Sequence, residues 1–460
     1  MKKASLIALS VVSLFGMVGC NGSTGNSSKT ESKASKEVLA AVEDAMKLSR
    51  DELMKKASEE LGSGTLKIEA VTSRGGKPAA IDKFVEELKK AGSTNTKPVD
   101  YSSTVDGKIY TILTGEVDAN TSDGFQGAIL QDGYQLQTKF IDKGYFVNYV
   151  PKEWSDASDS DKSAKDPFTL QYNFKTFMYN NAADANGNKI KIDNVWDITQ
   201  DKFKKKLFTM DPSNENVNMD FLIQLTDDKW NNVLKEAFED STNDNKSLDL
   251  SKYSQYGEKK YAYAFIAKFI ENAVFFADDG KAVNELATTP GAVGWIVYSK
   301  IQNIKETAKT SKKNITIAAL GDDNTDGANP GNSKLKGFGG FMYKHYMSIM
   351  PNAKYPYATC AFFNILSTTT EGYSAWATDV GDYPTLPSIN ADRTKGGHGT
   401  LGTEPDADGT YAFTKDASKE NLFPCLNDPS STWWNDSTKG NAVIEDASYI
   451  GTNYNRYGSF

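Results

Sequence analysis

The sequence has few of the residues that build metal centres and nucleic-acid interfaces. Its 460 residues include only 3 cysteines and 2 histidines, and His345 and His398 lie far apart along the chain. No CxxC pair or HExxH motif occurs, so we expect no metal site and no cofactor. The formal net charge is -8 and there is no long basic block. A surface that binds nucleic-acid phosphates is therefore excluded as the main function.

Enzyme motifs are also lacking. We find no P-loop, no glycine-rich dinucleotide fingerprint and no GxSxG nucleophile elbow, so the chain is not expected to be an enzyme. The many acidic residues leave a glycosidase pair as the enzymatic alternative. Residues 322–327 have calcium-loop spacing up to the glycine, but Ser333 cannot supply the closing bidentate carboxylate. A second acidic turn, residues 404–409, fails in the same way at Lys415, so both are interpreted as exposed polar loops.

The apolar run at the N-terminus, residues 4–18, is short for a membrane span. Lys2 and Lys3 precede it, and Gly19 and Cys20 follow it. This order is typical of a bacterial lipoprotein signal at residues 1–19, after whose removal Cys20 becomes the lipidated N-terminus. An ordinary secretory signal with a chance cysteine is the alternative. Residues 20–36 are rich in Gly, Ser, Thr, Asn and Lys and predict a flexible tether.

The two remaining cysteines leave the question of a disulfide open. An exported location permits a bond between Cys360 and Cys425. Cys360 lies in an apolar helical run, which is equally compatible with two free thiols.

Beyond the tether, helical and strand-like segments alternate. Residues 38–46 keep helical apolar spacing, and Ser49 with Glu52 predicts a capping box that opens a second helix. Short β-rich runs are interleaved with helices at residues 66–71, 98–102, 127–130, 207–210, 292–297 and 315–319. This alternation predicts α/β domains with largely parallel sheets. Ligands of such sheets bind outside the carboxyl ends of the strands.

Four segments near the predicted strand ends carry candidate binding side chains: residues 72–75, 131–134, 211–214 and 294–299. Arg74 is one of only 4 arginines, and hydroxyls beside it at a helix N-terminus suit an anionic or oxygen-rich ligand. Each segment also has an explanation without a ligand. Residues 72–75 fit a solvated turn, Asp132 fits a helix N-cap, and Trp295 fits core packing.

The order of these segments resembles the extracellular solute-binding proteins of bacterial ABC importers. The type in question is the two-lobed, type II periplasmic-binding-protein-like family, which includes ferric-ion, polyamine and sugar binders. The resemblance extends over about residues 50 to 390 and rests on ELMKKASEELGSGTLKIEAVTSRGG, GAILQDGYQLQ, FTLQYNFKTFMYNN, NVWDITQDKFKKKLFTMDPSN, ELATTPGAVGWIVYSKI, GFGGFMYKHYMSIMPNAKYPYATCAFFNILSTTTEGYSAW and GDYPTLPSI.

The resemblance implies two α/β lobes, with mixed sheets flanked by helices, that close on a solute by a hinge motion. The hinge strands would be residues 168–181 and 336–343. The first lobe would comprise residues 37–170 with 336–460, including a C-terminal extension, and the second lobe residues 171–335. Carried over position by position, the cleft would be lined by Thr72, Ser73, Arg74, Gly75, Gln131, Asp132, Tyr172, Asn173, Ser213, Asn214, Trp295, Tyr298 and Tyr383.

The resemblance leaves several solute classes open. Ferric-ion binders of this kind use paired tyrosines, whereas the matching motif here has Tyr383 alone. Polyamine binders need cleft carboxylates, which Asp132, Glu215 and Asp382 could supply, but Arg74 would oppose a cation. Aromatic faces with amides suit a sugar. A sugar or a small oxyanion is therefore the expected solute, with ferric ion or polyamine as alternatives.

The implied partners are a small solute, an ABC permease in the cytoplasmic membrane, and the membrane itself through the N-terminal lipid. The implied protein is a monomer on the outer face of the bacterial cell membrane. A lipid-anchored adhesin or receptor built on the same fold is the third functional class. The segment after about residue 390 is rich in aromatic residues and is expected to fold over the first lobe, because an exposed aromatic patch would be adhesive.

Overall fold

The computed structural model describes residues 31–212, 214–304, 314–318, 335–377, 382–390, 399–405 and 411–416. Several sequence features lie outside these ranges: the N-terminal signal with Cys20, the candidate Ser213, the acidic segment at 322–327, most of the acidic turn at 404–409, and Cys425. Among the described helices, none combines the length and the apolar character needed to cross a membrane.

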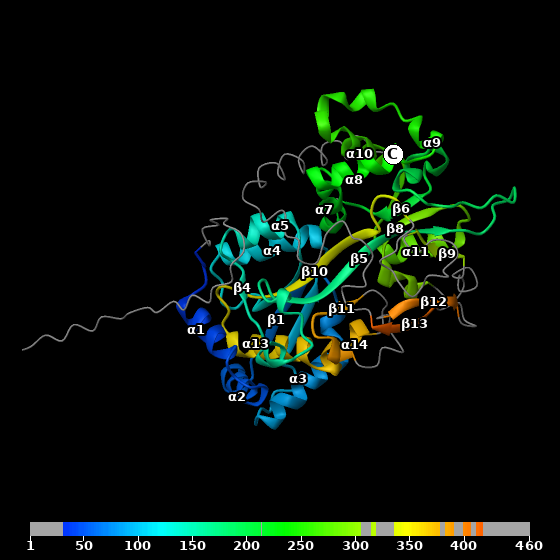
Figure 1. Cartoon of the computed structure of the whole chain (residues 1–460). Coiled ribbons are helices and arrows are strands. Elements are labelled where there is room, and N and C mark those ends of the chain that lie inside the picture. Colours follow the sequence, from blue (N-terminus) through cyan, green and yellow to red (C-terminus); the bar gives the residue numbers. More distant parts are fainter. Residues whose placement is uncertain are drawn as a thin grey trace, which may run out of the picture.

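One mixed sheet of 11 strands runs through the molecule (Figure 1). All six strands expected from the sequence are present, with ends that differ by two residues at most. Along the main path the order is β2 (Val99–Ser103), β1 (Leu66–Ala70), β3 (Gly127–Gln131), β10 (Gly340–Ile349), β5 (Thr169–Asn180), β8 (Val293–Val297), β6 (Leu207–Met210) and β7 (Ala273–Phe276). Three short strands pair off this path: β4 (Val147–Asn148), β9 (Ile315–Ile317) and β11 (Tyr383–Pro384).

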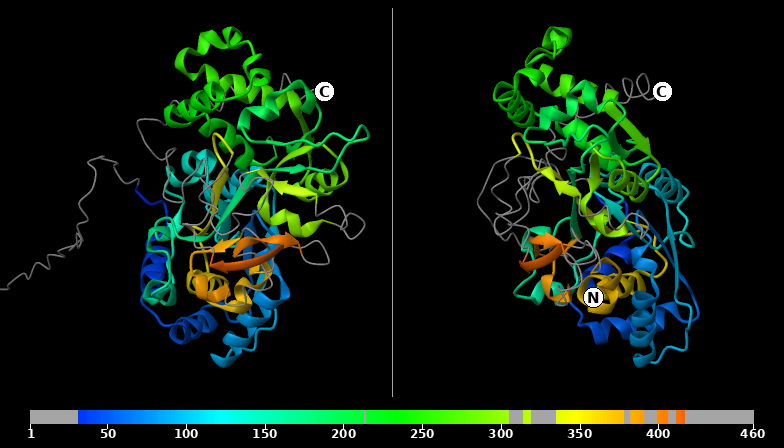
Figure 2. Two further views of the ribbon diagram at one scale, coloured as in Figure 1. Left: turned by 45° about the vertical axis from the view of Figure 1, so that its right-hand side comes forward. Right: turned by 90° about the vertical axis from the view of Figure 1, so that its right-hand side faces the viewer.

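The sheet consists of two parallel groups of strands joined by an antiparallel pair. Strands β2, β1 and β3 are mutually parallel, as are β7, β6 and β8. The long strands β5 and β10 pair antiparallel with each other and connect the two groups. Figures 1 and 2 show them running from the lower to the upper part of the molecule. The parallel strand pairing expected from the sequence is therefore present within each group but not between the groups.

Helices cover both groups of strands and define two halves. The first half has β1–β3 with α1 (Lys36–Ala45), α2 (Arg50–Leu61), α3 (Pro78–Lys90), α4 (Asp106–Asp118), α5 (Tyr134–Leu136), α6 (Lys152–Asp156), α13 (Pro356–Thr368) and α14 (Thr370–Ala377). The second half has β6–β8 with α7 (Asn216–Gln224), α8 (Asp228–Glu239), α9 (Asn243–Lys246), α10 (Lys260–Asn272) and α11 (Asp279–Thr288). The predicted capping box of Ser49 and Glu52 opens α2, and Pro78 occupies the first turn of α3.

Buried apolar side chains form two dense clusters, one centred on the second half and one that extends from the first half to α11, β8 and β9. In the second half a cluster of aromatic side chains packs against the sheet, and the rings of Phe221 and Trp295 stack with centroids 4.2 Å apart. In the first half, α13 is buried along almost its whole length, including the free thiol of Cys360. Such burial is the main source of stability for both halves.

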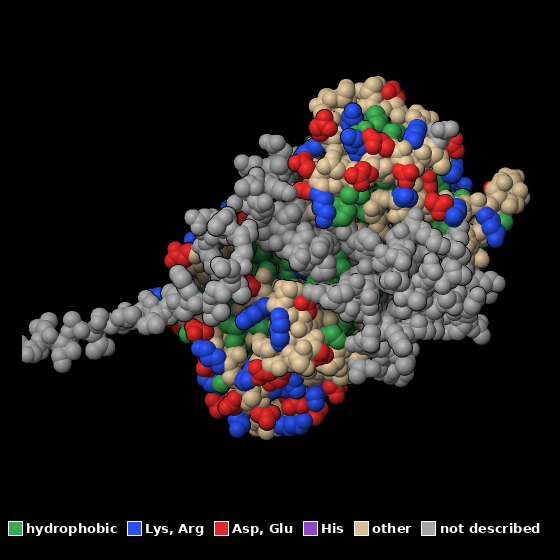
Figure 3. Space-filling model, viewed as in Figure 1, with side chains coloured by type: hydrophobic (Ala, Val, Ile, Leu, Met, Phe, Trp, Pro, Cys, Tyr) green, Lys and Arg blue, Asp and Glu red, His purple; other side chains and the backbone are tan. Residues whose placement is uncertain are grey.

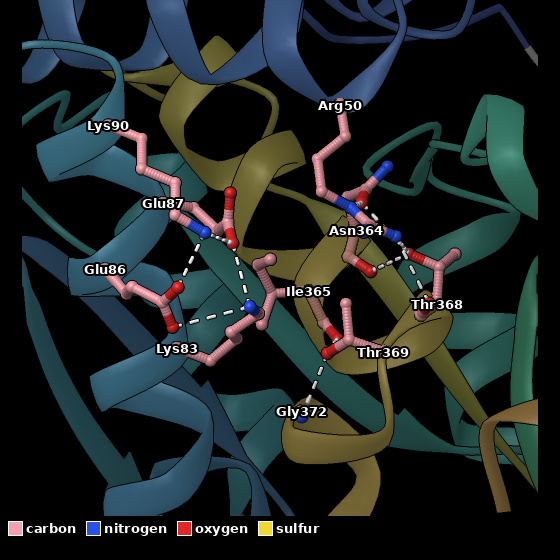
Figure 4. Close-up of polar contacts among 10 residues, drawn as sticks. All are labelled: Arg50, Lys83, Glu86, Glu87, Lys90, Asn364, Ile365, Thr368, Thr369 and Gly372. Atoms are coloured by element: carbon pink, nitrogen blue, oxygen red, sulfur yellow. Dashed lines mark hydrogen bonds and ion pairs between the residues drawn. The ribbon is translucent and has the colours of Figure 1, made fainter.

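Polar contacts tie the helices of the first half together (Figure 4). The Arg50 guanidinium donates from Nε to Asn364 Oδ1 at 3.0 Å and from Nη2 to Thr368 Oγ1 at 2.8 Å, which joins α2 to α13. On α3, Lys83 Nζ lies 2.8 Å from Glu87 Oε1. The Arg50 contacts thus connect two helices, whereas the Lys83–Glu87 pair lies within α3.

The surface and the C-terminal region add two observations. On the face in Figure 3, Lys and Arg side chains are interspersed with Asp and Glu over both halves. A separate hairpin of β12 (Gly399–Pro405) and β13 (Tyr411–Asp416) lies beside α14 of the first half in Figure 1. The rest of the chain after residue 390 lies outside the described ranges, so its expected position stays a prediction.

Candidate functional site

A buried polar network lies on the long strands, next to the turn that follows β1. Arg74 Nη1 donates to Asp382 Oδ2 at 2.5 Å, and Asn173 Nδ2 donates to the other oxygen of the same carboxylate. The side chain of Asp382 is fully buried, and that of Arg74 is 18% exposed. The structure thus brings the predicted residues Arg74 and Asn173 together on one carboxylate.

The turn that presents Arg74 depends on two glycines. A Cβ at Gly75 would lie 2.8 Å from the Tyr101 hydroxyl, and one at Gly76 would lie 2.6 Å from the Tyr101 ring. Tyr101 is anchored because its hydroxyl donates to the carbonyl of Thr72 at 2.8 Å. Glycine at both positions lets the turn pack on the ring and directs Arg74 toward β5.

The network continues through His345, which lies between two glutamines. Gln171 Nε2 is 2.9 Å from His345 Nδ1, and Gln131 Nε2 is 3.4 Å from His345 Nε2. Tyr373 donates to Gln171 Oε1 at 2.6 Å. Burial, with a smaller effect of Arg74, lowers the pKa of His345 to about 3, so the ring is neutral at physiological pH. The predicted residue Gln131 therefore belongs to the same network as Arg74.

A buried ion cluster lies further along β5. Lys175 Nζ contacts Glu215, which precedes α7, and lies 3.0 Å from Asp279 Oδ2 at the start of α11. Burial acts to lower the pKa of Lys175, but the two carboxylates outweigh it and raise that pKa. Burial raises the pKa of Glu215 to about 7 even though Lys175 lies against it. A single ammonium group therefore balances the charge of two buried carboxylates.

The two halves meet where α4 and α5 contact α7, and we call this region the junction. Asp106 Oδ2 of the first half accepts from the backbone N–H of Asn216 at 3.1 Å. Asp220 Oδ1 of the second half accepts from the backbone N–H of Tyr134 at 3.3 Å. Gln135 Nε2 donates to Asn216 Oδ1 at 2.7 Å. Each half thus places a carboxylate at the start of a helix that belongs to the other half.

The junction carboxyls share a strongly acidic environment. Burial, followed by the neighbouring acids Glu215 and Asp132, raises the pKa of Asp106 well above its usual value. Burial, followed by Asp106 and Asp132, does the same to the pKa of Asp220. The predicted residue Asp132 also holds the long strand, since its Oδ1 accepts from the backbone N–H of Lys344 at 2.8 Å.

Other predicted residues lie away from this network. Trp295 and Tyr298 are buried, Trp295 in the aromatic interior of the second half. Tyr172 points to the opposite face of β5 from Asn173, and its hydroxyl donates to Asp161 Oδ2 at 2.7 Å. Tyr383 is also buried and pairs with Tyr172 in the β11–β5 ladder.

The remaining predicted residues lie at loop positions. Thr72 Oγ1 accepts from the backbone N–H of Arg74 at 3.3 Å, and Ser73 is exposed. Asn214 is half-buried near the junction, and its carbonyl accepts from the backbone N–H of Gly107 at 3.4 Å. Ser213 lies outside the described residues.

Sequence analysis missed Gln171, His345 and Lys175 as members of the polar site. A signal for two of them was present, because Gln171, Asn173 and Lys175 alternate along a predicted strand and so lie on one face. Three polar residues on one face of a buried strand indicate a polar interior. Nothing local identifies Asp106 or Asp220, which meet only after the halves come together.

A pocket of about 670 Å³ lies elsewhere, within the second half. Its lining is polar and includes Gln200, Lys252 and Glu271, none of which belongs to the network or the junction. Among the described residues, no group of three or more His, Cys, Asp or Glu side chains is arranged to hold a metal ion.

Comparison with known proteins identifies the fold. No protein-family model and no curated protein sequence matches the chain. The periplasmic binding protein P5PA is similar in structure, with a TM-score of 0.51 at 10% identity over 84% of this chain and 99% of that one. AfuA from Actinobacillus pleuropneumoniae, with fructose 6-phosphate bound, has a TM-score of 0.51 at 11% identity over 84% of this chain and 97% of its own. The chain therefore has the α/β fold of two-lobed periplasmic binding proteins.

Proposed function

We propose that this protein is the solute-binding component of an ABC importer and that it delivers one small solute to a membrane permease. The observation that carries the proposal is the arrangement of the buried polar side chains. They come from both halves and gather where two long strands join two parallel groups of strands. The similarity to P5PA and AfuA supports it at the level of fold. The function is binding and not catalysis.

The two halves correspond in this proposal to lobes of residues 37–170 with 336–460 and of residues 171–335. Strands β5 and β10 act as the hinge, and closure brings Asn216 to Asp106 and Asp220 to Tyr134. Opening separates these pairs and exposes the carboxylates to water. Solute binding between the halves favours the closed state because only that state contacts the solute from both sides.

The proposal includes an attachment to the outer face of the cell membrane. A lipoprotein signal is supported by Lys2 and Lys3, the apolar run that follows them and Gly19-Cys20. In this proposal the lipid is attached to Cys20, and a tether leads from Cys20 to α1. The folded protein acts as a monomer beside its permease. Metabolic labelling with a radioactive fatty acid checks the anchor, and a label that persists in Cys20→Ser would contradict it.

Thermal unfolding of the purified full-length protein tests the function. A solute that binds only the folded state raises the melting temperature by mass action. We expect one class among sugars, oxyanions, organic amines and ferric complexes to do so, and to reduce the radius of gyration in X-ray scattering. No shift with any class, together with an unchanged scattering curve, would refute the proposal. Binding of a macromolecule without any small solute would favour the adhesin alternative.

A further inference from the structure

We propose that the solute is a small organic amine, bound at the junction with its protonated nitrogen between Asp106 of the first half and Asp220 of the second half. This inference rests on the proposed function, because it assumes that the solute binds between the halves. It differs from the sugar or oxyanion expected from the sequence. Three observations lead to it: the state of the basic residues, the unpartnered oxygens, and the geometry around Gly133.

Two basic residues of the polar site, Arg74 and Lys175, are already paired with acids. The guanidinium of Arg74 donates to the buried Asp382 carboxylate at 2.5 Å. The ammonium of Lys175 serves Glu215 and Asp279 together. An anionic solute would have to compete with these buried pairs. Because the Asp382 carboxylate balances the charge of Arg74, the expectation from the sequence that Arg74 would repel a cationic solute no longer applies.

The junction offers acceptor oxygens without donors. Asp106 is 5% exposed and Asp220 is 1% exposed. Asp106 Oδ1 and Asp220 Oδ2 are buried and have no hydrogen-bond partner among the described residues, although the other oxygen of each carboxylate accepts a backbone N–H from the opposite half. Buried carboxylates normally have their oxygens satisfied, and the described part of the chain supplies no donor to these two atoms. A protonated amine supplies both the N–H groups and the positive charge.

The unpartnered oxygen of Asp220 is directed across the junction. It faces Gly133, the residue with φ +145° that lies between Asp132 and Tyr134. A Cβ at Gly133 would come within 1.8 Å of Asp220 Oδ2. The carboxylate of the second half therefore points at the bend that follows β3 of the first half, where ligands of such sheets bind.

The charged groups around the two carboxyls are acidic as well. Those that act most strongly on Asp106 are Glu215 and Asp132, and those that act most strongly on Asp220 are Asp106 and Asp132. Burial and these neighbours raise both pKa values, which favours the protonated form of the two carboxyls. A bound ammonium favours the ionised carboxylates, and binding should therefore release protons into the solvent.

Isothermal titration calorimetry on the full-length protein tests the inference with putrescine and spermidine as probes. Glucose, inorganic phosphate and magnesium chloride serve as comparison ligands. We expect one of the amines to bind and to release protons, seen as an apparent enthalpy that changes with the ionisation enthalpy of the buffer. Amine binding without proton release would overturn the proposed site.

Isosteric variants locate the site. Asp106→Asn and Asp220→Asn should each weaken amine binding by about tenfold or more, because each removes one charge-assisted hydrogen bond. Both should keep or raise the melting temperature of the ligand-free protein, since each removes a buried carboxylate from an acidic cluster. Asp193→Asn, which removes an exposed carboxylate on a loop, is the matched control and should bind as wild type.

The outcomes separate this inference from the proposed function. Binding of glucose, phosphate or magnesium ion without any amine would overturn the inference and leave a solute-binding protein. Amine binding that both junction variants retain would also overturn it. Failure of every ligand class to bind would refute the proposed function itself. If either variant fails to fold, the comparison of ligands with the wild-type protein still decides whether the solute is an amine, and the other variant tests its position.

Discussion

Removal of the Lys175 ammonium should destabilise the protein severely and in a pH-dependent way. Lys175 is fully buried on β5, and the side chains of Glu215 and Asp279 are 10% and 4% exposed, so water screens none of the three groups effectively. In Lys175→Met two carboxylates remain buried without their cation. Loss of one partner from a buried ion pair typically costs about 3–5 kcal/mol. We expect a loss of this size in the free energy of unfolding at pH 8, measured by urea denaturation.

The pH dependence gives the sharper test. Burial already raises the pKa of Glu215 to about 7 in the folded state, and loss of Lys175 raises it further. An acid whose pKa is higher when folded than when unfolded stabilises the fold at low pH. That stability is lost as the pH rises from the unfolded value toward the folded one. The defect of Lys175→Met should therefore be smaller at pH 5 than at pH 8.

A compensated variant provides the control for this experiment. Lys175→Met combined with Glu215→Gln and Asp279→Asn removes all three charges and should recover most of the lost stability. If Lys175→Met unfolds with the wild-type free energy at pH 8, or with the same loss at pH 5 and pH 8, the argument from buried charge is refuted. No recovery in the triple variant would point to lost packing of the lysine side chain instead.

Three further predictions concern other parts of the molecule. Glu60→Gln should raise the melting temperature more at pH 8 than at pH 5, because burial raises the folded pKa of Glu60 to about 7; an equal effect at both pH values would contradict this. Trp295→Ala should lower the free energy of unfolding by about 3–5 kcal/mol, since Trp295 is fully buried and stacks on Phe221; a loss below about 1 kcal/mol in urea denaturation would place the ring outside the core. Gly133→Ala should hinder closure, because its methyl group would collide with Asp220 Oδ2; a solute-induced decrease in the radius of gyration as large as that of the wild type would show that the junction tolerates it.

Much of the secondary structure was predictable because its signals are local. The capping box of Ser49 and Glu52, the proline at the start of α3 and the short β-rich runs each depend on residues a few positions apart. These signals were sufficient for the alternation of helices and strands. They did not show that β5 and β10 join two parallel groups into one sheet, because strand pairing connects segments far apart in the chain.

The candidate site was only partly predictable for the same reason. Sequence analysis selected Arg74, Asn173 and Gln131 as residues of a ligand cleft, and the structure places them in one polar network. Their role in binding a ligand stays a prediction. It could not tell whether an aromatic residue near a strand end faces solvent or the core. The structure buries Trp295 among the aromatic residues of the second half.

The amino-acid sequence by itself indicated the alternation of helices and strands, the starts of α2 and α3 and the positions of six strands, because hydrophobic periodicity and capping act over one or two turns of chain. Only the tertiary structure decided the charge state of the site. Arg74 donates a hydrogen bond to Asp382, which lies 308 residues away in the sequence, and Asp106 accepts one from Asn216, which lies 110 residues away. Electrostatic interactions depend on distance in space and on burial. The spacing of residues along the chain gives neither quantity.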